Sequence, residues 1–454
     1  MDKKMGRQLA RRDFIKLAVV GGLGVGLTGA LAACQPAAAP APTSAPSSGQ
    51  PAAQPTQAPA KSGGKVTLQI WQHWAGGLEK VFRDQIDTFN KSQNEIEIQV
   101  TTIPLADQWT KVLAAIAAGS PPDTYTSAAM IRPELLRDGH LDSLDTYMKW
   151  PDDMFKTYDP QTLMGGTRVG VPINGGLWTI FCNLDLYKAA GLDTAKLPAT
   201  WDDVLEQGKK LTDASKNQFG LVLPNKPFSW TTEVWYGFLL SAGGDFLTPD
   251  NSEAAFNSDA GVQALQYWVD AFNTSKIAPL VTMDNAAIIT NYQTGKIGMM
   301  PMYPVQMGAV AGFKHKSMTV PAPTKKTKGT HFAGTYFPFM KGSKNKEAVA
   351  TFFKWWVQPE NQAKWAAGTG GLPISTGVTS TDTYKKFLKD QPMAQAFLDS
   401  MDFAKPLPMV VGISDMEQIV SEAIEEAVYK KSSPKDALDA AAQKVNDVIK
   451  KNKS

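Results

Sequence analysis

Polar and aromatic side chains stand together directly after the first predicted strand. Gln72, His73 and Trp74 follow the alternating apolar residues of 65–71. Ligands of open α/β sheets lie beyond the carboxyl ends of strands. The apolar face of a sugar ring stacks on an aromatic plane while its hydroxyls need convergent polar groups, so this trio has the chemistry of a carbohydrate site. The alternative is a core tryptophan beside a surface histidine.

Motifs of common exported hydrolases do not occur in the chain. There is no G-x-S-x-G and no H-E-x-x-H, and the four histidines, at 73, 140, 315 and 331, lack the spacing of metal ligands. Carboxylate pairs for glycoside hydrolysis leave no motif, so a glycan-active exported enzyme stays an alternative, as does a structural surface lipoprotein. We expect a protein that is not an enzyme, with no cofactor and no metal.

The first 33 residues have the layout of an export signal. Six basic residues precede an apolar run at 17–33, which at about 17 residues is shorter than the roughly 20 of a membrane span. Arg11-Arg12 and the following Asp13-Phe14-Ile15-Lys16 resemble the twin-arginine signal R-R-x-F-L-K. The sequence predicts a signal peptide at 1–33 and export, by the twin-arginine or the general pathway.

A lone cysteine ends this signal. Leu31-Ala32-Ala33-Cys34 resembles a lipobox, in which cleavage leaves the cysteine as the first residue with lipid on its sulfur. The next 26 residues are only Ala, Pro, Ser, Thr, Gln and Gly, a composition that cannot bury enough apolar surface to fold. We therefore predict a lipid anchor at Cys34, a tether at 34–63, and a location on the outer side of the cell membrane, facing the periplasm or the exterior. An incidental cysteine is the alternative.

The charge balance excludes one class of partner. Without residues 1–33 the chain carries 40 basic and 41 acidic residues, so the basic excess of the full sequence belongs to the signal. No basic face for nucleic acid is predicted. The second cysteine, Cys182, lies in an apolar run that predicts a buried strand.

From residue 65 onward, strand and helix patterns alternate. Residues 66, 68 and 70 alternate as in a strand, residues 96, 98 and 100 repeat that pattern, and apolar residues at 105, 109, 112, 113 and 116 fall on one helical face. Such alternation predicts an α/β fold, and the length predicts two lobes.

Several segments, in this order and spacing, resemble the extracellular solute-binding proteins of family 1, the sugar-binding lipoproteins of ABC importers. The resemblance covers essentially all of 65–450. It is carried by these segments: AAIAAGSPPD at 114–123, GVPINGGLWTIFCNLDLYKAAGLD at 170–193, LPATWDDVLEQGKKL at 197–211, TGKIGMM at 294–300 and KEAVATFFKWWVQPENQAKWAAGTGGLP at 346–373.

The resemblance implies a two-lobed α/β fold of the periplasmic-binding-protein type (type II), with a hinge and a central ligand cleft. We expect lobe 1 at 64–173 plus 325–371 and lobe 2 at 178–322 plus 376–454. The hinge crossings are expected near 174–177, 324 and 371, where glycines at 175, 176, 370 and 371 suit a change of backbone angles.

The resemblance also implies a role. A protein of this kind captures a small solute, here a mono- or oligosaccharide, and delivers it to a membrane permease; glycerol phosphate or a polyol is the alternative. The chain has no G-x-x-x-x-G-K-[ST], so the ATPase is another subunit. At the positions of the family's ligand contacts stand Ser127, Trp230 and Tyr303. Asn174 stands at the first expected crossing, from where it can reach between the lobes, and further candidates are Asp245, after a Gly-Gly turn, and Tyr336.

Overall fold

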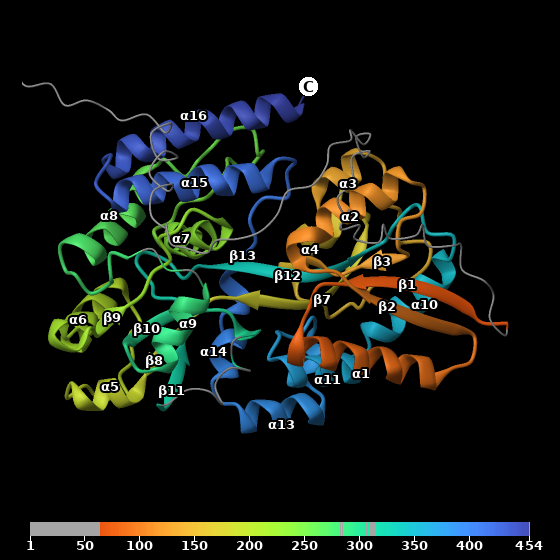
Figure 1. Ribbon diagram of the computed structural model, residues 1–454, viewed down its shortest axis with the longest axis horizontal. Helices are drawn as coiled ribbons and strands as arrows, with labels where there is room; N and C mark the ends of the chain where they lie inside the picture. The colour runs from red at the N-terminus through yellow and green to blue at the C-terminus, as the bar shows by residue number, and fades with distance from the viewer. Residues whose placement is uncertain (1–63, 282, 284, 306, 308–314, 454) are drawn as a thin grey trace, which may run out of the picture. The chain divides into compact units, whose positions relative to one another are not determined.

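The chain from residue 59 onward forms one compact unit in the computed structural model. Helices and strands alternate through it as the sequence predicts (Figure 1). The structure describes residues 64–281, 283, 285–305, 307 and 315–453. The signal, Cys34 and nearly all of the tether lie outside this part of the chain.

A three-stranded parallel sheet opens lobe 1. Strand β1 (Val66–Gln72) lies between β2 (Ile96–Thr102) and β3 (Thr124–Tyr125), and its Leu68 and Ile70 are fully buried. The helices of this lobe are α1 (Gly76–Ser92), α2 (Leu105–Ala117), α3 (Pro133–Arg137), α4 (Asp159–Thr162), α10 (Lys346–Trp356) and α11 (Pro359–Thr369). Because the strands are parallel, β1 ends at the same edge as its neighbours and presents Trp74 there.

Asp123, the last residue of the segment AAIAAGSPPD, links distant parts of lobe 1 through hydrogen bonds. One carboxylate oxygen accepts from the backbone N–H of Gln69 at 2.8 Å. The other accepts from Ser343 Oγ at 2.5 Å and from Asn345 Nδ2 at 3.2 Å, just before α10. The side chain is buried, so these donors have few substitute partners.

We therefore expect Asp123→Ala to lower the free energy of unfolding by about 3 kcal/mol, because it leaves buried donors without an acceptor. Asp87→Ala, an exposed aspartate on α1, is the matched control and should change stability by less than about 0.5 kcal/mol. Urea unfolding of the full chain measures both. Equal losses in the two variants would contradict this role for Asp123.

One long strand connects the two lobes. Strand β12 (Thr330–Pro338) pairs antiparallel with β7 (Gly170–Leu177) and with β4 (Ser127–Ala129), and parallel with β13 (Ala404–Lys405) (Figure 1). Its first residues contact lobe 2, where Thr330 Oγ1 donates to the carbonyl of Trp178 at 2.9 Å. Its last residues lie in lobe 1, where Thr124 Oγ1 donates to the carbonyl of Pro338 at 2.8 Å.

Lobe 2 is built on a second sheet with strand order β11, β8, β10, β9. Cys182 is fully buried in β8, as predicted, and burial raises the pKa of its thiol to about 12. The strands are β8 (Thr179–Asn183), β9 (Phe219–Leu221), β10 (Ile297–Met302) and β11 (Ser317–Val320). The helices are α5 (Leu184–Ala189), α6 (Trp201–Leu211), α7 (Ser229–Ser241), α8 (Asp259–Asn273), α9 (Asn285–Gln293), α14 (Ala394–Leu398), α15 (Ile413–Val428) and α16 (Pro434–Lys453).

Two expected boundaries need correction. The crossing expected near 324 lies later, because Thr324 pairs with Thr200 and the N–H groups of Lys326 and Thr327 donate to Ser241 at the end of α7. We place this crossing on β12, whose first residues contact Trp178 and whose last residues contact Thr124. The segment 376–390, with α12 (Thr376–Thr379) and α13 (Asp382–Asp390), packs against α11 of lobe 1 rather than with lobe 2.

The other two crossings lie side by side. Gly175 of β7 forms an antiparallel bridge with Leu372, directly after the glycine pair at 370–371. The expected crossings at 174–177 and 371 therefore lie next to each other in space, and each contains a pair of glycines. Gly370 ends α11 with a φ of 76°, a left-handed conformation that glycine adopts without strain.

Candidate functional site

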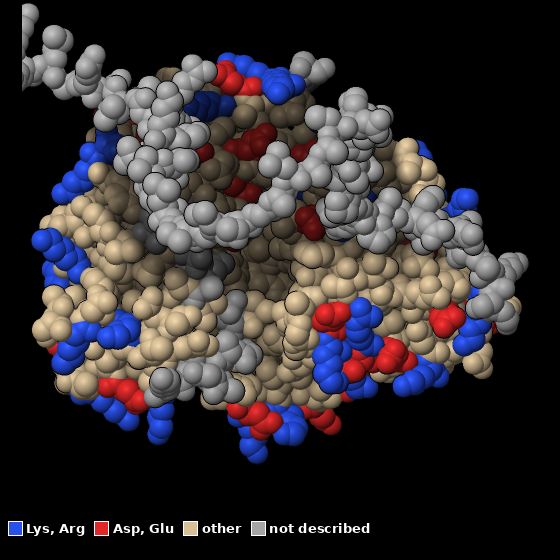
Figure 2. All heavy atoms as spheres, viewed as in Figure 1, with Lys and Arg blue, Asp and Glu red and all other residues tan. Residues whose placement is uncertain are grey.

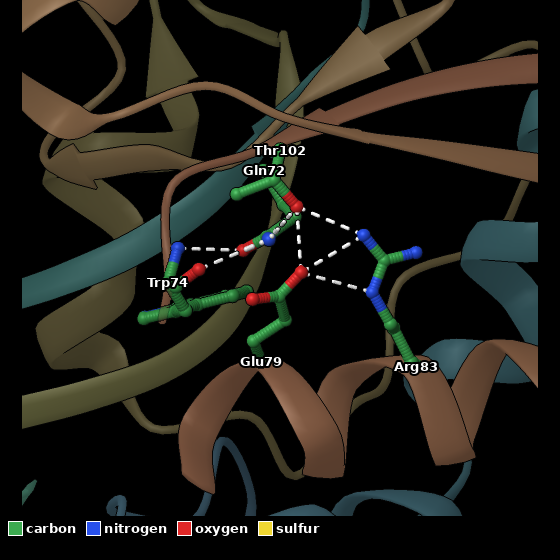
Figure 3. Close-up of polar contacts among 5 residues, drawn as sticks. All are labelled: Gln72, Trp74, Glu79, Arg83 and Thr102. Atoms are coloured by element: carbon green, nitrogen blue, oxygen red, sulfur yellow. Dashed lines mark hydrogen bonds and ion pairs between the residues drawn. The ribbon is translucent and has the colours of Figure 1, made fainter. Parts of the chain in front are cut away.

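A hydrogen-bond network fixes the loop that carries Trp74. Gln72 Nε2 donates to the carbonyl of Trp74 at 3.0 Å, and the N–H of Trp74 donates to Gln72 Oε1 at 2.5 Å (Figure 3). Gln72 also donates to Thr102 Oγ1, which donates in turn to Glu79. The hydrogen bonds of Glu79 with Thr102 and Arg83 lower its pKa. Gln72 has no exposed surface, and its hydrogen bonds hold the loop in place.

Trp74 is half-buried against other rings. Its centroid lies 5.1 Å from that of Trp365 on α11 and 5.3 Å from that of Phe82 on α1. The neighbouring His73 places Nδ1 2.7 Å from Thr126 Oγ1, and burial lowers its pKa to about 4. His73 is therefore neutral at physiological pH, and Trp74 presents the exposed part of its ring from a rigid support.

Helix α11 connects Trp74 to the second predicted aromatic residue, Tyr303. Trp365 lies one turn before the end of α11, and a methyl group placed on Gly370, its cap, would come within 2.8 Å of the carbonyl oxygen of Pro304. A methyl group on Gly176 of β7 would come within 3.4 Å of Tyr303 Cδ1. Tyr303 therefore lies beside Gly176, and the next residue, Pro304, lies beside Gly370, both at expected crossings.

Tyr303 joins a polar cluster that the sequence did not reveal. Its hydroxyl donates to Glu233 Oε2 at 2.9 Å and lies 2.9 Å from His331 Nδ1. Burial raises the pKa of Glu233 to about 7 and lowers that of His331 to about 3. Glu233 belongs to α7 and His331 to β12, so nothing in their sequence neighbourhoods pointed to this meeting.

Asn174 completes what we call the candidate site, formed by Trp74, Asn174, Glu233 and Tyr303. All four side chains are half-buried, which leaves each of them a solvent-facing part. Asn174 lies beside Gly371, where an added methyl group would come within 2.9 Å of its Nδ2. Its Oδ1 is buried and has no hydrogen-bond partner among the described residues.

Four other predicted residues have different surroundings. Ser127 is buried, and its Oγ donates to the carbonyl of Met130 at 2.5 Å, which closes a turn at Ala129 with a φ of 65°. Trp230 is only 5% exposed. Asp245 pairs with Lys405 and accepts from Tyr236 at 2.8 Å. Tyr336 is fully buried, and its hydroxyl has no hydrogen-bond partner among the described residues.

A second group of charged residues joins α3 to the start of α15. Arg132 Nη1 donates to Ser414 Oγ at 2.6 Å, and Glu134 Oε1 accepts from the N–H of Gly412 at 3.2 Å. One turn into α15 stands Glu417, which is 5% exposed. Acidic side chains gather deep in a hollow of the surface near α3 and α15 (Figure 2). The sequence patterns did not identify Glu134 or Glu417.

Other sites are not apparent in the described part of the chain. Two shallow surface depressions, one beside His140 and Lys341 and one beside Asn251 and Val410, contain none of the predicted residues. Across residues 64–453, the described His, Cys, Asp and Glu side chains form no group suited to a metal ion. Of the described helices, none has the length and apolar character to cross a bilayer.

The chain belongs to the bacterial extracellular solute-binding proteins, whose family model matches residues 74–363. The family resemblance and the two-lobed α/β fold class predicted from the sequence are thereby confirmed. The matched proteins described below are binding proteins rather than enzymes.

Three relatives illustrate this membership. The cyclic α-maltosyl-1,6-maltose binding protein of Arthrobacter globiformis is 28% identical, with a TM-score of 0.78 over 86% of this chain and all of that one. A maltose-bound protein of T. maritima matches at 20% identity with a TM-score of 0.73, over 84% of this chain and all of that one. The sn-glycerol-3-phosphate-binding periplasmic protein of Pectobacterium atrosepticum is 23% identical over 420 residues, 85% of this chain and 91% of the relative.

Proposed function

We propose that the chain captures a mono- or oligosaccharide between its lobes and delivers it to the permease of an ABC importer. The observation that carries this proposal is the candidate site, where the half-buried Tyr303 donates to the carboxyl of Glu233, and the half-buried Trp74 and Asn174 lie against Trp365 of α11 and Gly371 just after it. Rings of this kind stack on the apolar face of a sugar, and the polar groups bind its hydroxyls. The relative from A. globiformis, a maltosyl-maltose binding protein, supports the same ligand class.

Glycerol phosphate is the second candidate, supported by the relative from P. atrosepticum. A phosphate group requires several cationic donors. The candidate site itself contains a carboxyl group, and Arg132, the cation near it, already donates to Ser414. The charges therefore favour a ligand without phosphate.

A thermal-shift screen of the full chain tests the ligand class. The panel contains mono- and oligosaccharides, polyols and glycerol phosphates. A ligand at a hundredfold excess over its Kd stabilises the folded state by about 2.7 kcal/mol, which gives a measurable rise in Tm. We expect a saccharide to produce the largest rise. A panel in which no saccharide shifts the transition, or in which glycerol phosphate shifts it most, overturns the proposal.

Delivery of the ligand requires a change in the shape of the binding protein that the permease can recognise. Closure of two lobes around a ligand presents a combined surface that the free protein lacks. The crossings at β7 and at Gly370–Gly371, together with β12, are the segments that would bend. Since the chain has no phosphate-binding loop motif, we propose a separate ATPase subunit as the source of energy.

We further propose that the exported protein is held at the membrane by lipid on Cys34, which lies outside the described residues. Cys34→Ala should abolish membrane association or leave the precursor unprocessed, because the alanine has no sulfur to acylate. Fractionation of cells that express each variant measures this, with Cys182→Ala as the control that stays with the membrane. A correctly cleaved Cys34→Ala protein that remains in the membrane fraction would rule out this anchor.

A further inference from the structure

Two carboxyl groups from different helices meet beside the candidate site. Helices α7 and α15 pack together, and Thr232 Oγ1 donates to the main-chain carbonyl of Glu417 at 2.7 Å. The next residue on α7 is Glu233, which accepts from Tyr303. The two acids are 184 positions apart in the sequence, yet they are close enough for the charge on Glu233 to raise the pKa of Glu417.

Neither acid has a cationic partner. Among the described residues, no Lys, Arg or His lies within ion-pair distance of Glu233 or Glu417. The side chain of Glu417 is more than nine-tenths buried and forms no hydrogen bond with a described residue. A buried carboxylate without a counter-charge is costly, so the pair is incomplete in the free protein.

Arg132, the cation near Glu417, already has other partners. Arg132 acts on Glu417 through its charge, but its Nη1 donates to Ser414 Oγ at 2.6 Å and its guanidinium lies 5.5 Å from the ring centroid of Trp109. A third carboxyl, that of Glu134, has one oxygen, Oε2, buried without a partner. Among the ion pairs of the described residues, none joins Arg132 to Glu134, Glu233 or Glu417.

We propose that the ligand carries a protonated amine on its sugar or polyol ring, and that Glu233 and Glu417 pair with this ammonium group. The inference rests on the proposed carbohydrate function and specifies the ligand further. A neutral hydroxyl can hydrogen-bond to one carboxylate, but it does not offset two like charges in a partly buried place. A primary ammonium offers three donors and a full charge, which matches two carboxylates.

Proton release should accompany binding. Burial raises the pKa of Glu233 to about 7, so this acid holds a proton for part of the time near neutral pH; burial and the charge on Glu233 also raise the pKa of Glu417. An ammonium group favours the ionised carboxylates and expels that proton. The other titratable groups near the pair are Tyr303, whose pKa burial raises, and His331, whose pKa burial lowers to about 3; the charged groups Arg132 and Glu134 reach the start of α15 from α3.

Matched ligand pairs test the inference by calorimetric titration of the full chain. The pairs are glucosamine with glucose, galactosamine with galactose, mannosamine with mannose, and the β-1,4-linked glucosamine disaccharide with cellobiose. We expect the amino member of at least one pair to bind at least tenfold more tightly than its neutral counterpart. Its binding heat at pH 7 should also depend on the ionisation heat of the buffer, as proton release requires.

Charge-neutral variants complete the test. Glu233→Gln and Glu417→Gln should reduce the tenfold preference to less than threefold, whereas Glu426→Gln, an exposed glutamate on α15, should keep it. The inference alone is overturned if neutral sugars bind as tightly as their amino counterparts, or if both site variants keep the preference. If no member of any pair binds while another saccharide of the thermal-shift panel does, the inference is overturned and the carbohydrate function stands; if no saccharide binds at all, both are overturned.

Discussion

Glu233→Gln should stabilise the free protein against unfolding by up to about 3 kcal/mol more at pH 8 than at pH 4. Burial raises the pKa of Glu233 from 4.5 to about 7. Each unit of difference in pKa between the folded and unfolded states changes the free energy of unfolding by about 1.4 kcal/mol. Below pH 4.5 the carboxyl is neutral in both states, and it resembles the amide that replaces it.

The sign follows from proton binding. Between pH 4.5 and 7 the folded state holds a proton on Glu233 that the unfolded state has lost, so stability falls as pH rises through this window. Glutamine cannot ionise, so the variant escapes this loss. The hydrogen bond from Tyr303 remains possible, because the amide oxygen accepts it as the carboxylate does.

Two histidines, His73 and His331, give the stability a pH dependence of the opposite sign, and they do so in the parent and in the Glu233→Gln variant alike. Burial lowers the pKa of His73 to about 4 and that of His331 to about 3, so the unfolded state gains protons below pH 6.5 that the folded state does not take. Their contribution falls as pH falls, and it cancels when variant and parent are compared at the same pH. Urea unfolding at pH 4, 6 and 8, with Glu426→Gln as the control, gives that comparison. A difference between variant and parent that is the same at all three pH values would contradict the burial of an ionisable Glu233.

Gly220→Ala should destabilise lobe 2 by about 3 kcal/mol or more. A methyl group on Gly220 of β9 would lie 2.0 Å from the carbonyl oxygen of Gly208 and 2.5 Å from its Cα. Gly208 belongs to α6, so the contact joins two backbones and no side-chain rotation can relieve it. Overpacking of this kind costs about 1–3 kcal/mol where side chains can adjust, and more where they cannot.

Gly77→Ala is the matched control. Gly77 lies in α1, and no atom lies within 4 Å of an added methyl group. Alanine favours the helix by about 0.5–1 kcal/mol over glycine, so this variant should be unchanged or slightly more stable. Thermal unfolding of both variants measures the contrast. A Gly220→Ala protein as stable as the control would show that α6 and β9 are not packed backbone to backbone.

The elements of this fold were predictable because their signals are local. The alternation at 66–70 gives β1, and Thr200 before Trp201 marks the start of α6, where the structure has a full capping box with Asp203. Contacts between backbones, such as that of Gly208 with Gly220, depend on tertiary packing and leave no local signal. The apolar face predicted for α2 is buried only in part, because burial also depends on tertiary packing, and its Leu105 remains 54% exposed.

The candidate site was predicted in part. Trp74, Asn174 and Tyr303 were identified from strand ends and the family resemblance, and the structure connects them through α11 and the hinge glycines. The side chains of Gln72 and Ser127 donate hydrogen bonds to main-chain carbonyls two or three residues further along the chain. Glu233 and Glu417 were missed because each lies on a mostly buried helix, and only the packing of α7 on α15 brings them together.

The most direct test of the central claim is to titrate the saccharide that gives the largest thermal shift into the full chain and then recover it for mass spectrometry. We expect saturation at one saccharide per chain, recovery of the saccharide unchanged, and at least tenfold weaker binding by Trp74→Ala than by Trp150→Ala; the ring of Trp150 lies against Arg168. Cleaved saccharide, or equal affinity in the two tryptophan variants, would contradict capture at this site.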